Sequence, residues 1–116
     1  MADFRDLVEL IVKFREERNW KQFHNPKDMA ISLALEATEV LEHFQWKSSE
    51  EIEQYLKGAG GAQLSEELAD VLYWVLLLAH DLGIDLDQAF RVKMVKNDAK
   101  YPIAKARGSH LKYDQL

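Results

Sequence analysis

The 116-residue chain contains no cysteine, only two prolines and only five glycines. Without cysteine it can form neither a disulfide framework nor a thiolate metal site, and we expect a reducing compartment, the cytoplasm. Prolines and glycines stand where helices would begin or end, and no segment alternates with the period of a β-strand. The sequence therefore predicts an all-α protein with short connections.

The chain also lacks a long apolar run and an excess of basic residues. Its longest strongly apolar run, residues 71–79, is less than half of the roughly 20 residues that a membrane span requires. The first residues, MADFRDL, have no apolar core of a signal peptide. The net charge of -5 argues against a general binder of nucleic acids or acidic membranes. We expect a soluble protein with no nucleic-acid or membrane partner.

Helical spacing and capping residues divide the chain into five expected helices. They cover about residues 3–19, 26–45, 49–57, 64–82 and 86–100. Asn25 before Pro26 predicts one start, Ser48 with Glu51 a capping box, and Asp85 a third cap. Gly83 predicts a left-handed helix end. The glycine-rich residues 58–63 are expected to be a flexible loop, acting as a lid or a joint.

A chain of this length suits one domain, and association with further copies would enlarge its modest core. We predict a single domain over residues 1–116, oligomeric, in which about residues 102–116 form a C-terminal arm or tail.

Two of the expected helices carry acids inside their apolar stripes. Glu36 and Glu39 are three residues apart and share the sector of the core residues, and Glu67 and Asp70 repeat this spacing. Antiparallel packing of the two helices would bring four carboxylates together. Their repulsion, about 4 kcal/mol per pair at 4 Å and an effective dielectric near 20, requires protonation or a cation. One such pair alone is usually a solvated face, but two favour a metal site.

Oxygen-only ligands suit a hard divalent cation, Mg²⁺ with Mn²⁺ as a possible substitute. A carboxylate-bridged di-iron bundle would instead place Glu-x-x-His motifs on its helices. Val40 and Leu77 stand three residues before His43 and His80, so these histidine ligands are missing and iron is disfavoured.

The two acid pairs resemble the E-x-x-E and E-x-x-D motifs of the all-α nucleoside triphosphate pyrophosphatases, the MazG-like superfamily. Further segments are similar to its dCTP pyrophosphatase branch, and the similarity spans nearly the whole chain. These segments are WKQFHNP at 20–26, EHFQWK at 42–47, EELADVL at 66–72 and KMVKNDAKYP at 93–102.

The resemblance implies a four-helix-bundle type fold, assembled as a homodimer or as a homotetramer of two dimers, with sites at subunit junctions. It implies Mg²⁺-dependent hydrolysis of a nucleoside triphosphate to the monophosphate and pyrophosphate, on dCTP or modified dCTP, in cleansing of the nucleotide pool. Glu36, Glu39, Glu67 and Asp70 take the catalytic, metal-ligand positions. Ile11 stands where the animal enzymes have a histidine that contacts the base, which puts the base preference in doubt.

Substrate contacts are expected from basic and aromatic residues. Lys93, Lys96 and Lys100 share a face of the last helix with Asn97 and Tyr101; a solvated basic face is the simplest interpretation, but this context favours phosphate contact. Lys105 or Arg107 would reach in from the tail.

Aromatic residues usually belong to a core. The resemblance favours base contact for Trp20 and Trp46, and less strongly for Trp74. His24, in a loop near Trp20, is expected to bond a base or sugar, although a plain surface histidine fits as well.

Two other hypotheses stay open. One is a MazG-like pyrophosphatase with a broad or non-cytosine substrate range. The other is a non-catalytic helical assembly or adaptor protein whose acids form salt bridges between subunits.

Overall fold

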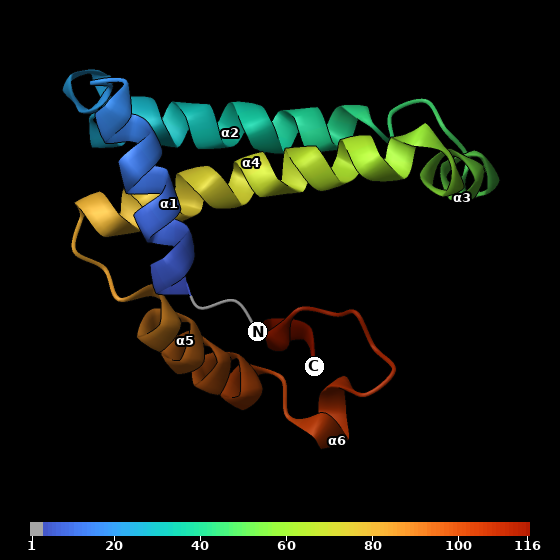
Figure 1. Ribbon diagram of the computed structural model, residues 1–116. Coiled ribbons are helices and arrows are strands. Elements are labelled where there is room, and N and C mark those ends of the chain that lie inside the picture. Colours follow the sequence, from blue (N-terminus) through green and yellow to red (C-terminus); the bar gives the residue numbers. More distant parts are fainter. Residues whose placement is uncertain (1–3) are drawn as a thin grey trace. The chain divides into compact units, whose positions relative to one another are not determined.

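The computed structural model describes residues 4–116, and the regular structure within this range is entirely helical (Figure 1). The elements are α1 (Phe4–Glu17), η1 (Lys21–Phe23), α2 (Pro26–Glu42), α3 (Ser49–Lys57), α4 (Ala59–Asp81), α5 (Leu86–Lys100), α6 (Ile103–Ala106) and η2 (Tyr113–Gln115). The all-α prediction is confirmed. None of the helices in the described range is long and apolar enough to cross a membrane.

The chain forms two compact units, which we describe separately. The first ends at Gly83 and the second runs from Ile84 to Leu116. The single domain over residues 1–116 stays a prediction.

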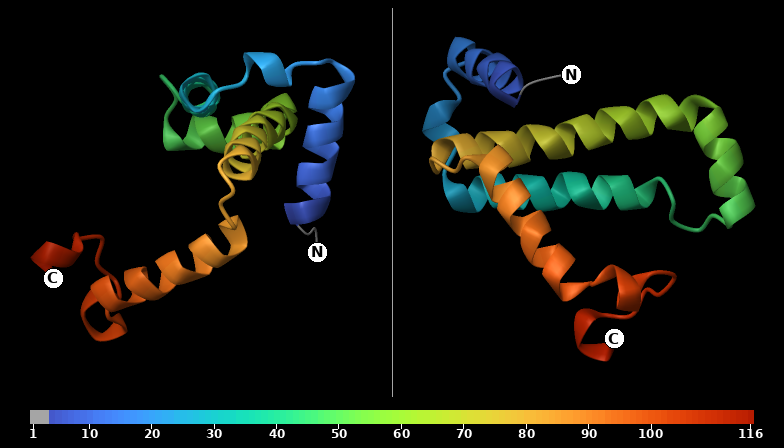
Figure 2. Two further views of the ribbon diagram at one scale, coloured as in Figure 1. Left: turned by 90° about the vertical axis from the view of Figure 1, so that its left-hand side faces the viewer. Right: turned by 90° about the horizontal axis from the view of Figure 1, so that it is seen from below.

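In the first unit, α2 and α4 run antiparallel side by side, and α3 connects them at one end (Figures 1 and 2). Helix α1 packs against α4 near the opposite end. The most deeply buried apolar side chains come from these three long helices: Ile11, Met29, Leu76, Leu77 and Ala79. The antiparallel packing on which the convergence of the acids depends is therefore present.

The predicted helix starts and ends are largely confirmed. The side chain of Asn25 accepts a hydrogen bond from the backbone N–H of Asp28, 2.9 Å away, at the start of α2. Ser48 and Glu51 form the reciprocal capping box of α3. Gly83 follows α4 with a φ of +68°, in the left-handed region that favours glycine. Helix α2 ends at Glu42, three residues before the predicted end, because a turn over 43–46 follows it.

The prediction that residues 58–63 form a flexible loop was wrong. Helix α4 begins at Ala59, so Gly60 and Gly61 lie in its first turn. A Cβ atom on Gly60 would lie 2.5 Å from ring atoms of Tyr55, and one on Gly61 would lie 2.5 Å from the Leu56 carbonyl oxygen. These glycines therefore allow the end of α3 to approach α4 closely, and this contact outweighs their poor helix propensity.

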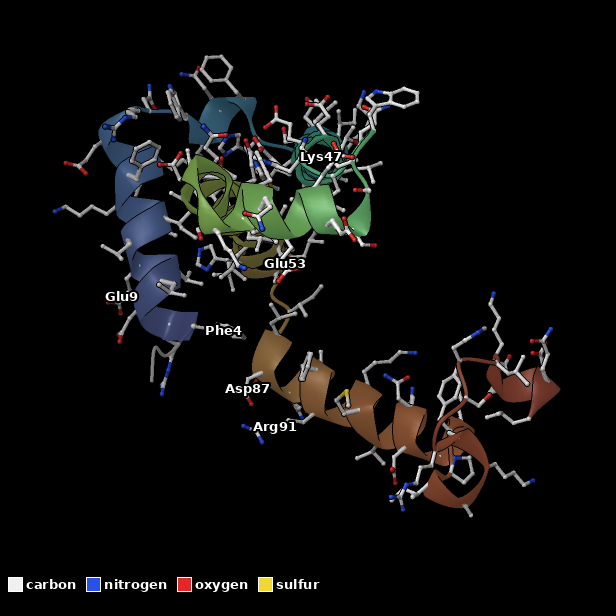
Figure 3. The ribbon with its side chains drawn as sticks, turned by 90° about the vertical axis from the view of Figure 1, so that its right-hand side faces the viewer. Phe4, Glu9, Lys47, Glu53, Asp87 and Arg91 are labelled. Carbon is white, nitrogen blue, oxygen red and sulfur yellow. The ribbon has the colours of Figure 1, made fainter. Side chains whose placement is uncertain are left out.

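The second unit consists of α5 and an arm that carries α6 and η2. The side chain of Asp85 caps α5 as predicted. Asp87 and Arg91 form an exposed ion pair one turn apart on α5, with 2.7 Å between Oδ1 and Nε (Figure 3). At the end of the arm, the Tyr113 ring packs edge-to-face on Tyr101, and Lys100 Nζ lies 4.9 Å from its centroid. Residues 102–116 thus include ordered helical segments.

Large apolar side chains remain exposed on both long helices of the first unit. Leu35 and Leu41 on α2 and Leu68 on α4 each expose more than half of their surface. Exposed apolar surface of this kind is typical of an interface between chains. The oligomer stays a prediction.

Candidate metal centre

The antiparallel pair α2 and α4 brings three of the four predicted acids to one place. Glu36, Glu67 and Asp70 each offer a carboxylate oxygen, and the three oxygens lie within 4.8 Å of one another. Glu36 and Glu67 are half-buried and Asp70 is exposed. The fourth acid, Glu39, is exposed on α2, but its carboxylate lies close enough to affect the ionisation of Glu36 and Glu67. We call Glu36, Glu39, Glu67 and Asp70 the acid cluster.

Two oxygens of the acid cluster are left without a donor. Oε2 of Glu36 and Oε2 of Glu67 are inaccessible to solvent, and no donor among the described residues bonds to them. A buried carboxylate oxygen with no donor raises the free energy of the folded state. This cost indicates a missing positive partner, either a proton or a cation.

Mutual repulsion and burial shift the ionisation of the cluster toward the protonated form. Burial, followed by the negative charges of Glu39 and Asp70, raises the pKa of Glu36 to about 7. A hydrogen bond with Glu39, followed by burial, raises the pKa of Glu67. In the absence of a cation, the cluster therefore retains protons at pH values where isolated carboxyl groups are ionised.

The donor set fits a hard divalent cation. Mg²⁺ binds oxygens at 2.0–2.1 Å, so two of its ligand oxygens are at most about 4.2 Å apart. Three carboxylate oxygens within 4.8 Å need only small side-chain movements to meet this requirement. Their positions on two packed helices, and the two oxygens that lack donors, fit such an ion. The ligand roles of these acids stay a prediction.

The predicted aromatic contacts fall into two environments within the first unit. Trp46 lies in the turn after α2 with 91% of its surface exposed and a φ of +66°. Trp20 is 41% exposed and packs edge-to-face on Phe14 with 5.6 Å between centroids. Trp74 is half-buried on α4, where His24 packs edge-to-face on it at 5.4 Å. Trp46 thus has the most free surface for a ligand, and His24 and Trp74 contact each other.

The predicted phosphate contacts all belong to the second unit. Lys93 and Lys96 line a surface hollow of about 400 Å³ on α5 together with Asp85, Gln88, Ala89 and Val92. The half-buried Asn97 donates to Met94 Sδ at 3.9 Å, while Lys100 and Tyr101 contact Tyr113. Contact of these residues with a phosphate stays a prediction.

Sequence reasoning missed the best-buried ion pair of the described residues. Arg15, on α1, donates from Nη1 to Asp81 Oδ2 at 2.7 Å and from Nη2 to Asp81 Oδ1 at 2.9 Å. The side chains are only 2% and 10% exposed. The hydrogen bond from Arg15 lowers the pKa of Asp81. Arg15 stands in the apolar stripe of α1, four residues after Ile11. A charged residue inside an apolar stripe is the signal that identified Glu36, and it could have identified Arg15 as well.

Comparisons with known proteins agree with this geometry. Residues 31–116 match the MazG-like family. The dCTP pyrophosphatase 1 proteins of Bos taurus and Mus musculus are 40% and 41% identical over 112 residues, which is 96% of this chain. This chain spans 66% of the length of each of these relatives, slightly less than two thirds.

A solved structure is also similar. The crystal structure of a pyrophosphatase from Archaeoglobus fulgidus superposes with a TM-score of 0.80 at 38% sequence identity, covering 88% of this chain and 94% of that one. The resemblance read from the acid motifs is confirmed by these matches. The chain belongs to the MazG-like family.

Proposed function

We propose that the protein is a divalent-metal-dependent nucleoside triphosphate pyrophosphohydrolase that converts dCTP or a modified dCTP to the monophosphate and pyrophosphate. The observation that carries the proposal is the acid cluster, whose three converging oxygens and two unbonded oxygens would be stabilised by a cation, which no described residue supplies there. The animal relatives are named dCTP pyrophosphatase 1, which supports dCTP as the proposed substrate. Removal of such triphosphates would cleanse the nucleotide pool.

Glu36, Glu67 and Asp70 would hold the metal, for which Mg²⁺ is the proposed ion and Mn²⁺ a substitute. When bound, the metal would neutralise phosphate charge and lower the pKa of a water bound to it. Glu39 is exposed and lies outside the three converging oxygens. It is therefore our candidate to orient the attacking water and accept its proton.

The remaining contacts would bind the phosphates through positive charge and the base through stacking. Lys93, Lys96 and Lys100 would offset the negative charge of the phosphates, because a hydrolase with an acidic site otherwise repels its substrate. The exposed ring of Trp46 offers a flat surface on which a base can stack. The exposed apolar surface of α2 and α4 supports a homodimer or a homotetramer of two dimers as the working form.

A product analysis tests the proposal. The protein is incubated with Mg²⁺ and a panel of ribo- and deoxynucleoside triphosphates, and the products are separated by ion-exchange chromatography. We expect dCMP and pyrophosphate from dCTP, with the highest kcat/KM for cytosine substrates. Release of orthophosphate, or no turnover of any triphosphate, would contradict the proposal.

The same panel separates the alternatives. Similar kcat/KM values for all bases would favour the broad or non-cytosine MazG-like enzyme. An adaptor whose acids form salt bridges between subunits would show no turnover and no change of melting temperature with Mg²⁺ and nucleotide.

A further inference from the structure

The Arg15–Asp81 pair contacts a third residue, His24, for which the sequence predicts contact with a base or sugar. Arg15 Nη1, which donates to Asp81, also lies 3.4 Å from Nδ1 of His24 and forms a hydrogen bond with it. The three residues come from α1, the end of α4 and the segment between η1 and α2. A single buried guanidinium therefore connects the ends of two helices to the imidazole.

The contact with Arg15 determines which nitrogen of His24 carries the proton. A guanidinium has donors and no acceptor, so Nδ1 of His24 must accept. The proton of the uncharged ring is then on Nε2. The Trp74 ring, at 75° to the imidazole and 5.4 Å from it, supports the ring on another side.

The charges around His24 keep this state populated. Burial, followed by the positive charge of Arg15, lowers the pKa of His24. Asp81 acts in the opposite direction, and Lys21, whose Nζ lies 3.9 Å from Asp81 Oδ2, adds to the lowering. The uncharged ring is therefore the main form at neutral pH.

His24 contacts α4 through Trp74, one turn after Asp70. It packs on Trp74, which follows Asp70 by four residues, about 6 Å along the helix axis. Trp74 also shares the sector of Glu67 and Asp70 on α4. The ring of His24 therefore packs on a residue that lies one helical turn from Asp70.

We infer that Arg15 and Asp81 are positioning residues that hold His24 in a single tautomer, with its proton on Nε2, as a hydrogen-bond donor next to Trp74. The inference deepens the proposed function and rests on it for the identity of the ligand. A fixed donor selects a ligand group that accepts, such as a carbonyl, a hydroxyl oxygen or a phosphate oxygen, and disfavours a group that only donates.

The tautomer is measured directly, without substrate. Long-range ¹H–¹⁵N NMR correlations of the imidazole nitrogens are recorded on the full chain at pH 7.5, and His24→Phe identifies the signals of His24 among the four histidines. We expect an unprotonated Nδ1 and a protonated Nε2. A protonated Nδ1, an imidazolium, or averaged nitrogen shifts would overturn the inference.

A double substitution tests the role of the pair. Arg15→Met with Asp81→Leu removes both charges together, so that neither is left buried and unpaired. We expect the variant to fold and the nitrogen shifts of His24 to become averaged. Lys21→Gln is the matched control, because it removes a charge near Asp81 but no donor to Nδ1. Unchanged His24 shifts in a folded double variant would overturn the inference.

Kinetics connect the tautomer to the substrate. His24→Phe keeps a ring against Trp74 and removes the donor, so KM for dCTP should rise about tenfold, with a smaller change in kcat. The double variant should show a rise in KM in the same direction. An active wild type with unchanged KM in His24→Phe would refute the donor role. A wild type that turns over no triphosphate refutes the proposed function instead, and the tautomer measurement then decides the inference by itself.

Discussion

Helix α4 carries acids in two regions whose electrostatics are opposite. At its C-terminal end, Asp81 meets Arg15, and the pKa of the carboxyl falls below its ordinary value. About four turns earlier, Glu67 meets only other acids among the described residues, and its pKa rises, as does that of Glu36 to about 7. Both regions place carboxylates against the apolar sector of the helix.

The difference lies in where the positive charge comes from. For Asp81 the chain itself supplies the positive charge, from Arg15, and this acid therefore has a structural role. No donor among the described residues bonds to two inaccessible oxygens of the acid cluster, so their positive partner must be a proton or a cation from outside the chain. An acid in an apolar stripe therefore indicates a binding site when no basic residue of the chain faces it.

The largest expected effect is on turnover. Asp70→Asn and Glu39→Gln each remove one negative charge from the acid cluster while preserving shape. Loss of an outer-shell partner of a metal typically costs 10–100-fold, so loss of a cluster acid should reduce kcat/KM for dCTP by more than about 100-fold. Glu66→Gln, on the exposed neighbour of Glu67, is the control and should remain active. Full activity in both cluster variants would remove these acids from the mechanism.

The second effect compares two Arg–Asp pairs of equal length. The contacts of Arg15 with Asp81 and of Arg91 with Asp87 are both 2.7 Å, but the first pair is buried. The second pair, labelled in Figure 3, is exposed. Arg15→Met leaves the buried Asp81 with Lys21, whose exposed Nζ lies 3.9 Å away, in place of its close guanidinium partner, and should reduce the free energy of unfolding by about 3 kcal/mol. Arg91→Met should leave the urea midpoint unchanged. Equal midpoints for the two variants would contradict the structural role of Arg15.

The third effect is the response of thermal stability to metal. Mg²⁺ with nucleotide should raise the melting temperature of the wild type by about 10 °C at 100 times its Kd, through binding to the folded state. Glu36→Gln removes repulsion, so its metal-free melting temperature should be higher and its response to Mg²⁺ smaller. Differential scanning fluorimetry measures both. An identical Mg²⁺ response in the two proteins would place the ion elsewhere.

The smallest effect is on the pH dependence of metal-free stability. The folded-state pKa of Glu36, about 7, exceeds its ordinary value of 4.5, so its ionisation destabilises the fold as pH rises toward 7. Stability in chelator should therefore increase as pH falls from about 7 to 4.5. Asp81 has the opposite shift, so its stabilisation is present above 3.8 and is lost as pH falls further. Urea unfolding across this range should show a maximum between the two regions; a steady decline from pH 7 would contradict it.

Much of the fold follows from short-range signals in the sequence. Asn25, the Ser48 and Glu51 box, Gly83 and Asp85 act within one helical turn, and their predicted roles are confirmed. The glycines of residues 58–63 led to the wrong prediction of a loop. Their role depends on the ring of Tyr55 and the carbonyl of Leu56, which come near only in the packed structure.

The acids of the candidate site were predictable for a similar reason. Glu36 and Glu67 share sectors with core residues of their own helices, and antiparallel packing of two helices was enough to bring them together. The pairing of Arg15 with Asp81 joins residues 66 positions apart on helices whose mutual placement helical periodicity does not determine. Its contact with His24 depends in turn on that placement.

Direct measurement of metal binding tests the central claim, that the acid cluster takes its cation from outside. Mn²⁺ is titrated into metal-free protein, and free Mn²⁺ is followed by electron paramagnetic resonance. The wild type is predicted to remove at least one ion per chain from the free pool, and Asp70→Asn to remove far less at the same concentration. Equal binding by the two folded proteins, or no binding by the wild type, would contradict the claim.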